Sequence, residues 1–355
     1  MQNPKSMRVF FHSLENEKLT AKTPDNQLLD FSCTEVQTRE LADLSFALRE
    51  GGVLNLLNIN GSEFEFLIFE PDYLIDISSL AECFKPYGAH PLNYSLSRMR
   101  NRTITAPILL GNIANFFIDE FVNEDITQPV EFVSTMKKLF RTAAFECTAC
   151  EDLKNPKQEQ EFFRNCYTHF KNIRYAVQHF FPKADIDKDK IVLEPSFISN
   201  VLGLQGRLDI MLCDFTKFIE LKSGKAVEDF RSGGTFIHSA ENHYMQMILY
   251  LVVLEFNLNL PSDAVDSYLL YSKYPLLSKE KHSRTQLQKA LMLRNQIVAR
   301  EFILHQQNDI ATADALLSGI SSEQLNSAQL TGKFFDNYLA PSIDQFPQAF
   351  SALNE

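Results

Sequence analysis

The chain has 355 residues, of which 45% are hydrophobic, and it carries a formal net charge of −11 with a pI of about 5.3. This length is enough for about two globular domains, and the composition is that of a protein with a sizeable buried core. The acidic balance excludes a surface coated with phosphate-binding lysines, so any contact with nucleic acid must use a local basic patch.

The first 18 residues do not form an export signal, because no basic segment is followed by an apolar core of about 7–15 residues. The longest apolar run, residues 245–256, is too short to span a bilayer. We therefore expect a soluble, intracellular, cytoplasmic protein with no membrane contact. In such a chain the six cysteines are expected to be reduced thiols.

Residues 1–78 contain stretches in which apolar and polar positions alternate, which predicts a small β-rich N-terminal region. From residue 79 the period changes, and apolar residues recur every three or four positions. This pattern predicts three consecutive helices, over residues 109–124, 130–153 and 159–181. The part at about 125–185 is interpreted as a helical insertion in a domain that spans 79–355.

Short apolar, β-prone segments follow, and they predict strands over residues 190–197, 204–214, 217–223 and 264–275. A long helix is expected over 239–258, between the third and fourth of these strands, and the remainder to residue 355 has a helical period. The predicted fold is therefore α/β, with a helical insertion and a helical C-terminal tail.

Three charged residues stand out because they lie in the two apolar strands of a predicted hairpin. Asp209 is in the first strand, and Glu220 and Lys222 leave the same face of the second. Two carboxylates on neighbouring strands can hold Mg²⁺ or Mn²⁺, and a nearby lysine can orient an attacking hydroxide. The alternative is an ion pair between Asp209 and Lys222 at the rim of a sheet, with Glu220 solvated.

These residues resemble the PD-(D/E)XK nucleases, and among them the RecB-like branch. The resemblance rests on the segments "GLQGRLDIM", "IELKSGK" and "HYMQMILY", which occur in that order. It covers roughly residues 79–275. The resemblance implies a restriction-endonuclease-like core, with a mixed central sheet flanked by helices. It also implies metal-dependent hydrolysis of DNA phosphodiesters, with Asp209 and Glu220 as metal ligands and Lys222 as the catalytic lysine.

The resemblance extends to further metal ligands. Glu194 is similar to an additional acidic residue that precedes the aspartate strand in this branch. Where these nucleases usually offer a metal-binding histidine, this chain has Asn115, whose carbonyl oxygen is a weaker ligand. Asp119, one helical turn later, is an alternative ligand or a solvated helix residue.

Substrate-binding residues are expected next to this metal site. Gln246 and Tyr250 lie one turn apart on the same face of the predicted helix, with His243 beside them. Lys225 and Arg231 follow the second strand and are expected to contact phosphates.

The closest resemblance is to the nuclease modules of replication and repair nuclease-helicases, which implies single-stranded or flap DNA as substrate and a helicase as partner. The sequence itself has no G-x-x-x-x-G-K-[ST] motif of a helicase motor. A second hypothesis remains open, namely a catalytically inactive DNA-binding or assembly module that keeps the nuclease fold.

The cysteines suggest two metal sites that we do not expect to form. The spacing of Cys147, Cys150, Cys166 and His169 matches a zinc ribbon, but all four fall in predicted helices without the turn glycines of zinc knuckles. Some related nucleases bind an iron-sulfur cluster, for which Cys83 could be the first ligand. No cysteine follows Cys213, so neither zinc nor an iron-sulfur cluster is expected.

Overall fold

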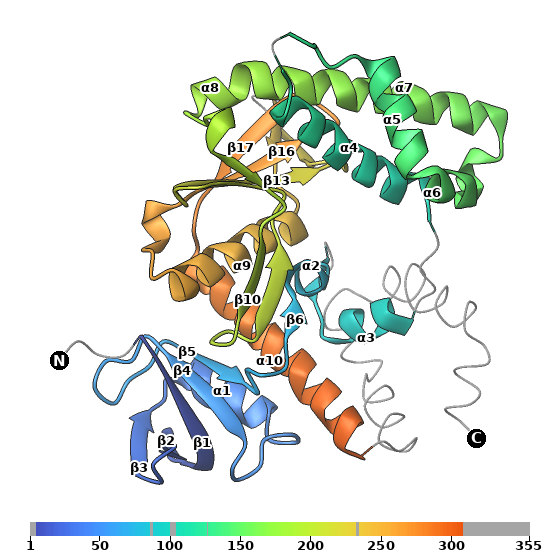
Figure 1. Cartoon of the computed structure of the whole chain (residues 1–355). Coiled ribbons are helices and arrows are strands. Elements are labelled where there is room, and N and C mark those ends of the chain that lie inside the picture. Colours follow the sequence, from blue (N-terminus) through green and yellow to red (C-terminus); the bar gives the residue numbers. More distant parts are fainter. Residues whose placement is uncertain (1–4, 86–87, 100–103, 126, 232–233, 308–355) are drawn as a thin grey trace, which may run out of the picture.

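The computed structural model describes residues 5–307, apart from 86–87, 100–103, 126 and 232–233 (Figure 1). It is a mixed α/β protein, as the sequence predicted. Among the helices in these ranges, none is both long and apolar enough to cross a membrane. The predicted C-terminal helical tail beyond Gln307 lies outside the described residues.

The N-terminal part is a five-stranded antiparallel sheet in the order β3-β2-β1-β4-β5. Helix α1 (Glu35–Asp43) begins with a capping box, in which Thr34 and Gln37 satisfy each other's backbone amides. The Gln37 amide also donates to the carbonyl of Phe64 at 2.6 Å, which attaches α1 to the segment before β5. The strands are β1 (Ser6–Glu15), β2 (Lys18–Lys22), β3 (Leu28–Ser32), β4 (Val53–Leu57) and β5 (Phe66–Phe69).

A second five-stranded sheet, in the order β17-β16-β13-β12-β9, forms the centre of the molecule. Only β13 and β16 are parallel, so the sheet is mixed. Its strands are β9 (Ile191–Leu193), β12 (Ile210–Leu212), β13 (Lys217–Lys222), β16 (Asp266–Tyr271) and β17 (Leu276–Glu280).

Helices cover both faces of the central sheet (Figure 1). Because side chains alternate along a strand, Phe218 packs in the core that contains α9 (Glu241–Asn257), whereas Ile219 packs in the core that contains α4 (Ala106–Val122) and α7 (Pro156–Tyr175). Glu220 and Lys222 therefore share the face of Phe218, toward α9.

The helices on the α4 side are packed through phenylalanines. The ring of Phe170 lies edge-on or tilted against those of Phe117, Phe121 and Phe132, with centroids 4.8–5.3 Å apart. The predicted helix over 130–153 is interrupted after Thr142 and again at Cys150. The observed elements are α5 (Phe132–Thr142), α6 (Ala144–Ala149), the 3₁₀ turn η1 (Glu151–Leu153), the π-helical turn η2 (Ala176–Phe180) and α8 (Phe181–Lys183).

Two predicted strands are each split in the structure, which corrects the sequence interpretation. Segment 190–197 becomes β9 and β10 (Ser196–Ser199), and segment 204–214 becomes β11 (Leu204–Arg207) and β12. The cause is a shared bend, because Glu194 adopts a left-handed conformation with φ of 51° before a proline. The Glu194 N–H donates to the Asp209 carbonyl at 2.9 Å, so the two neighbouring segments bend side by side.

Strands β10 and β11 then form a small sheet with β6 (Ile75–Asp76), which pairs parallel to β11. This sheet connects the N-terminal part to the central one. The remaining elements are α2 (Ile77–Ala81), β7 (Phe84–Lys85), β8 (Gly88–Ala89), α3 (Leu92–Met99), η3 (Lys188–Lys190), β14 (Val227–Arg231), β15 (Gly234–His238), η4 (Ser262–Ala264) and α10 (Arg284–Gln307).

Arg294 of α10 connects the segment after β5 with the loop between β10 and β11, and its side chain is fully buried. The guanidinium donates to the carbonyls of Glu70 at 2.9 Å and Tyr73 at 2.7 Å, and also to that of Phe69. It also packs against Gly203, which has φ of +60° and where a Cβ would overlap the guanidinium. The loop between β10 and β11 is thereby held against α10.

We expect Arg294→Met to lower the free energy of unfolding by about 3 kcal/mol or more, because several buried carbonyls lose their donor at once. Urea denaturation measures this change. Lys289→Met, an exposed substitution on the same helix, is the control and should leave the midpoint unchanged. An equal, small effect of both variants would contradict the proposed role of Arg294.

Candidate active site

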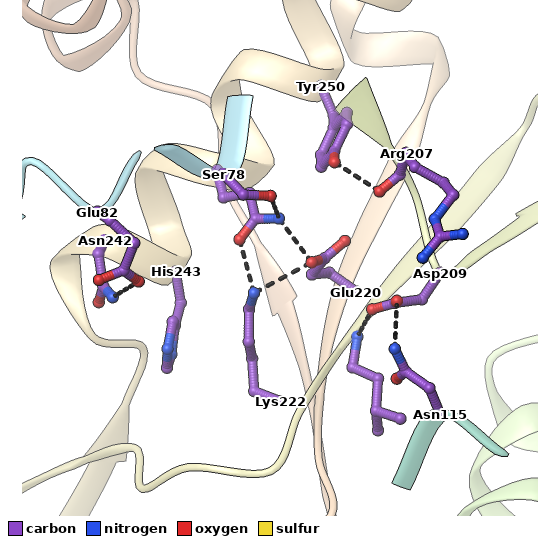
Figure 2. Close-up of polar contacts among 12 residues, drawn as sticks. Ser78, Glu82, Asn115, Arg207, Asp209, Glu220, Lys222, Asn242, His243 and Tyr250 are labelled. Carbon is purple, nitrogen blue, oxygen red and sulfur yellow. Dashed lines mark hydrogen bonds and ion pairs between the residues drawn. The ribbon is translucent and has the colours of Figure 1, made fainter. Parts of the chain in front are cut away.

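The β12–β13 hairpin brings the three predicted charges together. Ile210 pairs with Ile219, so Asp209 lies immediately before β12, beside Glu220 on the next strand. The Asp209 Oδ2 atom accepts a hydrogen bond from the backbone N–H of Leu221 at 2.6 Å. This bond fixes the Asp209 carboxylate across the hairpin, next to the strand that carries Glu220 and Lys222 (Figure 2).

Glu220 is buried, with a relative exposure of 5%. Its Oε1 atom accepts hydrogen bonds from Lys222 Nζ at 3.0 Å and from Gln246 Nε2 at 2.6 Å. Lys222 Nζ also donates to Gln246 Oε1 at 2.6 Å, which closes a three-membered network. The second oxygen, Oε2, is buried and has no hydrogen-bond partner in the described part of the chain. An unpaired carboxylate oxygen in such a position is costly unless something charged binds to it.

The two carboxylates disfavour each other's ionisation. Burial, together with the neighbouring charge of Glu220, raises the pKa of Asp209 to about 8. Burial also raises the pKa of Glu220, although Lys222 and Gln246 oppose this shift. The alternative arrangement, with Lys222 paired to Asp209 and Glu220 in solvent, is wrong, because Lys222 bonds to a buried Glu220.

Tyr250 and Gly206 hold the strand that leads to Asp209. The Tyr250 hydroxyl donates to the Arg207 carbonyl at 2.7 Å, and burial raises the pKa of this tyrosine. A Cβ on Gly206 would lie 3.0 Å from the Tyr250 ring, so glycine allows helix α9 to approach β11 closely. Gln246 and Tyr250, both predicted to bind substrate, thus bond to protein groups and shape the site.

On the other side of Lys222 lies His243, the third helix residue predicted from sequence. Its Nδ1 is 3.0 Å from the Tyr271 hydroxyl. Burial and the nearby charge of Lys222 lower the pKa of His243 to about 4, so the imidazole is neutral at neutral pH. The Glu82 carboxylate lies close to Lys222 and His243, and it accepts a hydrogen bond from Asn242 Nδ2 at 2.7 Å.

Sequence reasoning did not find Ser78 or Glu82. The Ser78 hydroxyl accepts a hydrogen bond from Gln246 Nε2 at 3.1 Å (Figure 2). Both residues come from the segment around α2, far from the hairpin in sequence, and no motif marks them. The parallel pairing of β6 with β11 and the packing of α2 against α9 bring them to the site.

Helix α4 approaches Asp209 from the opposite face. Asn115 Nδ2 donates to Asp209 Oδ1 at 3.3 Å, so the structure places Asn115 beside Asp209 with its amide nitrogen toward the carboxylate. Glu194 pairs with Arg207 at 3.0 Å, and its carboxylate is partly exposed. Burial and the charge of Glu194 raise the pKa of Asp119 to about 6. An open cleft of about 440 Å³ lies between α4, the α5–α6 junction and the bend in the strands, and it is lined by Asn115, Asp119, Glu194 and Arg207.

The donors fit a small hard cation only in part. No group of three or more His, Cys, Asp or Glu side chains within the described ranges is arranged to hold a metal ion. Glu220 is buried and Asp209 is half-buried, and Glu220 Oε2 has no hydrogen-bond partner among the described residues. Mg²⁺ is commonly bound through one or two carboxylates and keeps several waters, so this pair suits Mg²⁺ or Mn²⁺ better than a metal that needs an all-protein shell.

The two predicted phosphate contacts lie outside this network. Lys225 is exposed, three residues beyond Lys222. Arg231 lies at the end of β14, but its side chain is outside the described part of the structure.

The residues of the zinc-like spacing have other surroundings. Cys150 and Cys166 are buried free thiols, and His169 bonds the Ser272 hydroxyl at 2.8 Å through Nδ1. Cys83 is also a buried free thiol, and its Sγ donates to the Ser79 carbonyl at 3.4 Å.

Comparison with known proteins does not assign a family: no protein-family model matches the chain, and no curated protein matches it significantly. The chemistry of the site therefore has to be argued from its own residues.

We expect stability to fall as the pH rises from 5 to 9 in EDTA. Asp209 has a folded pKa of about 8, raised above the ordinary value of 3.8, so the folded state favours the protonated form. That contribution is fully present below about pH 4 and is lost as the pH passes through about 8. Asp209→Asn should remove this loss and raise the melting temperature at pH 8 by several degrees, measured by scanning calorimetry.

The matched control is Asp214→Asn, which changes an exposed carboxylate in the turn of the same hairpin. It should leave the pH dependence between 5 and 9 as in the parent protein. Parallel curves for Asp209→Asn and the parent protein would show that Asp209 is charged in the folded state.

Proposed function

We propose that the chain is a divalent-metal-dependent deoxyribonuclease with a PD-(D/E)XK site of the RecB-like type on a restriction-endonuclease-like core. The observation that carries this proposal is the convergence of Asp209, Lys222 and Gln246 on Glu220, whose second carboxylate oxygen, Oε2, is buried and has no hydrogen-bond partner among the described residues. The mixed sheet between two helical layers supports the proposed core.

In this proposal Asp209 and Glu220 would hold Mg²⁺ or Mn²⁺. Glu194 and Asn115 would become further oxygen ligands only after rearrangement, because Glu194 pairs with Arg207 and the Nδ2 atom of Asn115 faces Asp209. The bound ion would supply charge neutralisation at the phosphate and a more acidic water. Asn115 orients Asp209 through its hydrogen bond, and Gln246 does the same for Glu220.

Lys222 has a different role, because its ammonium lies beside Glu220 but does not depend on a metal for its position. It is placed to orient the attacking water and to stabilise the negative charge that develops on the phosphate. Its two acceptors fix the Nζ atom before substrate arrives, and such preorganisation is what makes a charge effective in catalysis.

The substrate in this proposal is single-stranded or flap DNA, as the sequence resemblance implies, with a helicase as partner. The open cleft along α4 is lined by Asn115, which bonds Asp209, and by Arg207, whose guanidinium pairs with Glu194 and could turn to a phosphate. Lys225 is exposed beyond the β13 strand and can contact the backbone further along.

A second candidate is a catalytically inactive DNA-binding or assembly module. The observation in its favour is that only two carboxylates converge, and that an asparagine takes the place of the expected histidine. Against it stands the burial of Asp209 and Glu220 side by side, which destabilises the fold and serves no purpose in a module without catalysis.

We expect the purified protein to cleave end-labelled single strands and flaps with Mg²⁺ or Mn²⁺, and to lose this activity in EDTA. Asp209→Asn and Glu220→Gln should each reduce cleavage to background while the fold remains intact by circular dichroism, because each removes one charged ligand. Metal-dependent cleavage retained by either variant would reject the site. A parent protein that binds these DNAs without cutting them would support the second candidate.

Lys222→Ala should slow single-turnover cleavage by on the order of 10²-fold while DNA affinity stays nearly unchanged, because its charge acts on the transition state. Lys225→Ala is the contrasting variant, since loss of a phosphate contact should weaken binding and reduce its salt dependence while sparing the rate at saturating DNA. If Lys222→Ala binds poorly and cleaves at the parental rate, Lys222 is a phosphate contact.

A further inference from the structure

The side-chain amide of Gln246 can adopt only one of its two orientations. Its Oε1 atom accepts from Lys222 Nζ at 2.6 Å, and its Nε2 atom donates to Glu220 Oε1 at 2.6 Å. The reversed amide would point its N–H₂ group at an ammonium and its oxygen at a carboxylate, and both contacts would be repulsive. Gln246 is buried, so no solvent is available to relieve a misplaced amide.

The second Nε2 hydrogen is bound by Ser78, whose hydroxyl oxygen lies 3.1 Å away. Without this acceptor a buried N–H would have no partner, and the amide would rotate to find one. Any such rotation moves Gln246 relative to Lys222 and Glu220 together. Ser78 thus completes the hydrogen bonding of Gln246, which contacts both Lys222 and Glu220.

The position of Ser78 is set by the strand that leads to Asp209. Strand β6 pairs parallel to β11, with Ile75 opposite Leu204. Asp76 then caps α2 by accepting from the N–H of Ser79 at 2.8 Å, and Ile77 packs against Gly206 of β11. Because α2 starts directly from this pairing, Ser78 is held at a fixed place relative to β11 and to α9.

We infer that Ser78 is a positioning residue of the site, which acts through Gln246 to hold Lys222 and Glu220 in register. The inference rests on the proposed nuclease function and assigns part of it to the N-terminal region, which the sequence motifs do not include. Glu82, from the same segment, supports it independently, since its carboxylate lies near Lys222 and bonds Asn242 of α9 (Figure 2).

The test is single-turnover cleavage of single-stranded DNA at saturating concentration, alongside a binding titration. Ser78→Ala should slow cleavage by about tenfold, the lower end of what loss of a supporting hydrogen bond costs at metal sites, with unchanged DNA affinity. Ser78→Thr keeps the hydroxyl and should recover most of the rate. Ser79→Ala, on the same helix but with a side chain outside the network, is the control and should cleave at the parental rate.

A double-mutant cycle separates positioning through Gln246 from a general structural effect. If Ser78 acts through Gln246, the double variant Ser78→Ala, Gln246→Ala should cleave no more slowly than Gln246→Ala alone. Single effects that multiply in the double variant would overturn the inference, as would a parental rate for Ser78→Ala.

The same cycle measured by urea unfolding in EDTA needs no activity. Ser78→Ala should shift the midpoint in the parent protein but not in the Gln246→Ala background, and additive shifts would overturn the inference. If the parent protein cleaves no DNA, the proposed function fails and the unfolding cycle alone decides on Ser78. If it cleaves and the cycles are additive, the function stands and the role of Ser78 does not.

Discussion

The half-buried carboxylate of Asp209 lies beside the buried carboxylate of Glu220 in the hairpin of the central sheet, and the hydrogen bonds around the site accommodate this pair. Neither Asp209 nor Glu220 can ionise freely, because burial raises both pKa values and the charge of Glu220 further raises the pKa of Asp209. Three of the four carboxylate oxygens accept a hydrogen bond from a different element. The neighbouring strand donates to Asp209 Oδ2, Asn115 of helix α4 donates to Asp209 Oδ1, and Gln246 of helix α9 donates to Glu220 Oε1. The remaining oxygen, Glu220 Oε2, is buried and has no hydrogen-bond partner among the described residues.

The bend at the edge of the sheet determines where Asp209 lies relative to the cleft beside α4. Glu194 adopts the left-handed conformation and its N–H donates to the Asp209 carbonyl. The chain therefore passes from β11 of the small sheet to β12 of the central sheet at Asp209. The cleft beside α4 opens at this bend. Strand β11 begins directly after Gly203, and Arg294 of α10 holds Gly203 in place. The N-terminal sheet and α10 thereby support the strand that leads to Asp209.

The grouping of the charged side chains could be predicted from sequence because it depends on short-range rules. A tight turn and a period of two place Asp209 beside Glu220 and Lys222, and a period of 3.6 places Gln246 and Tyr250 on one face of a helix. The bend at Glu194 could not be read, since apolar β-prone residues continue on both sides of it. Ser78 was also out of reach, because its position depends on β6, a two-residue strand whose partner is distant in the sequence and which has no pattern of its own.

Isothermal titration of Mn²⁺ into the protein at pH 7, repeated in two buffers of different ionisation enthalpy, tests the central claim most directly. The heats give both the affinity and the number of protons released. If Asp209 and Glu220 form the metal site, binding must displace the proton that a pKa of about 8 leaves on Asp209, so we expect one ion per chain and about one proton released. The Glu220→Gln variant should show no such binding. Absence of binding in the parent protein, or binding that releases no proton and survives Glu220→Gln, would contradict the account.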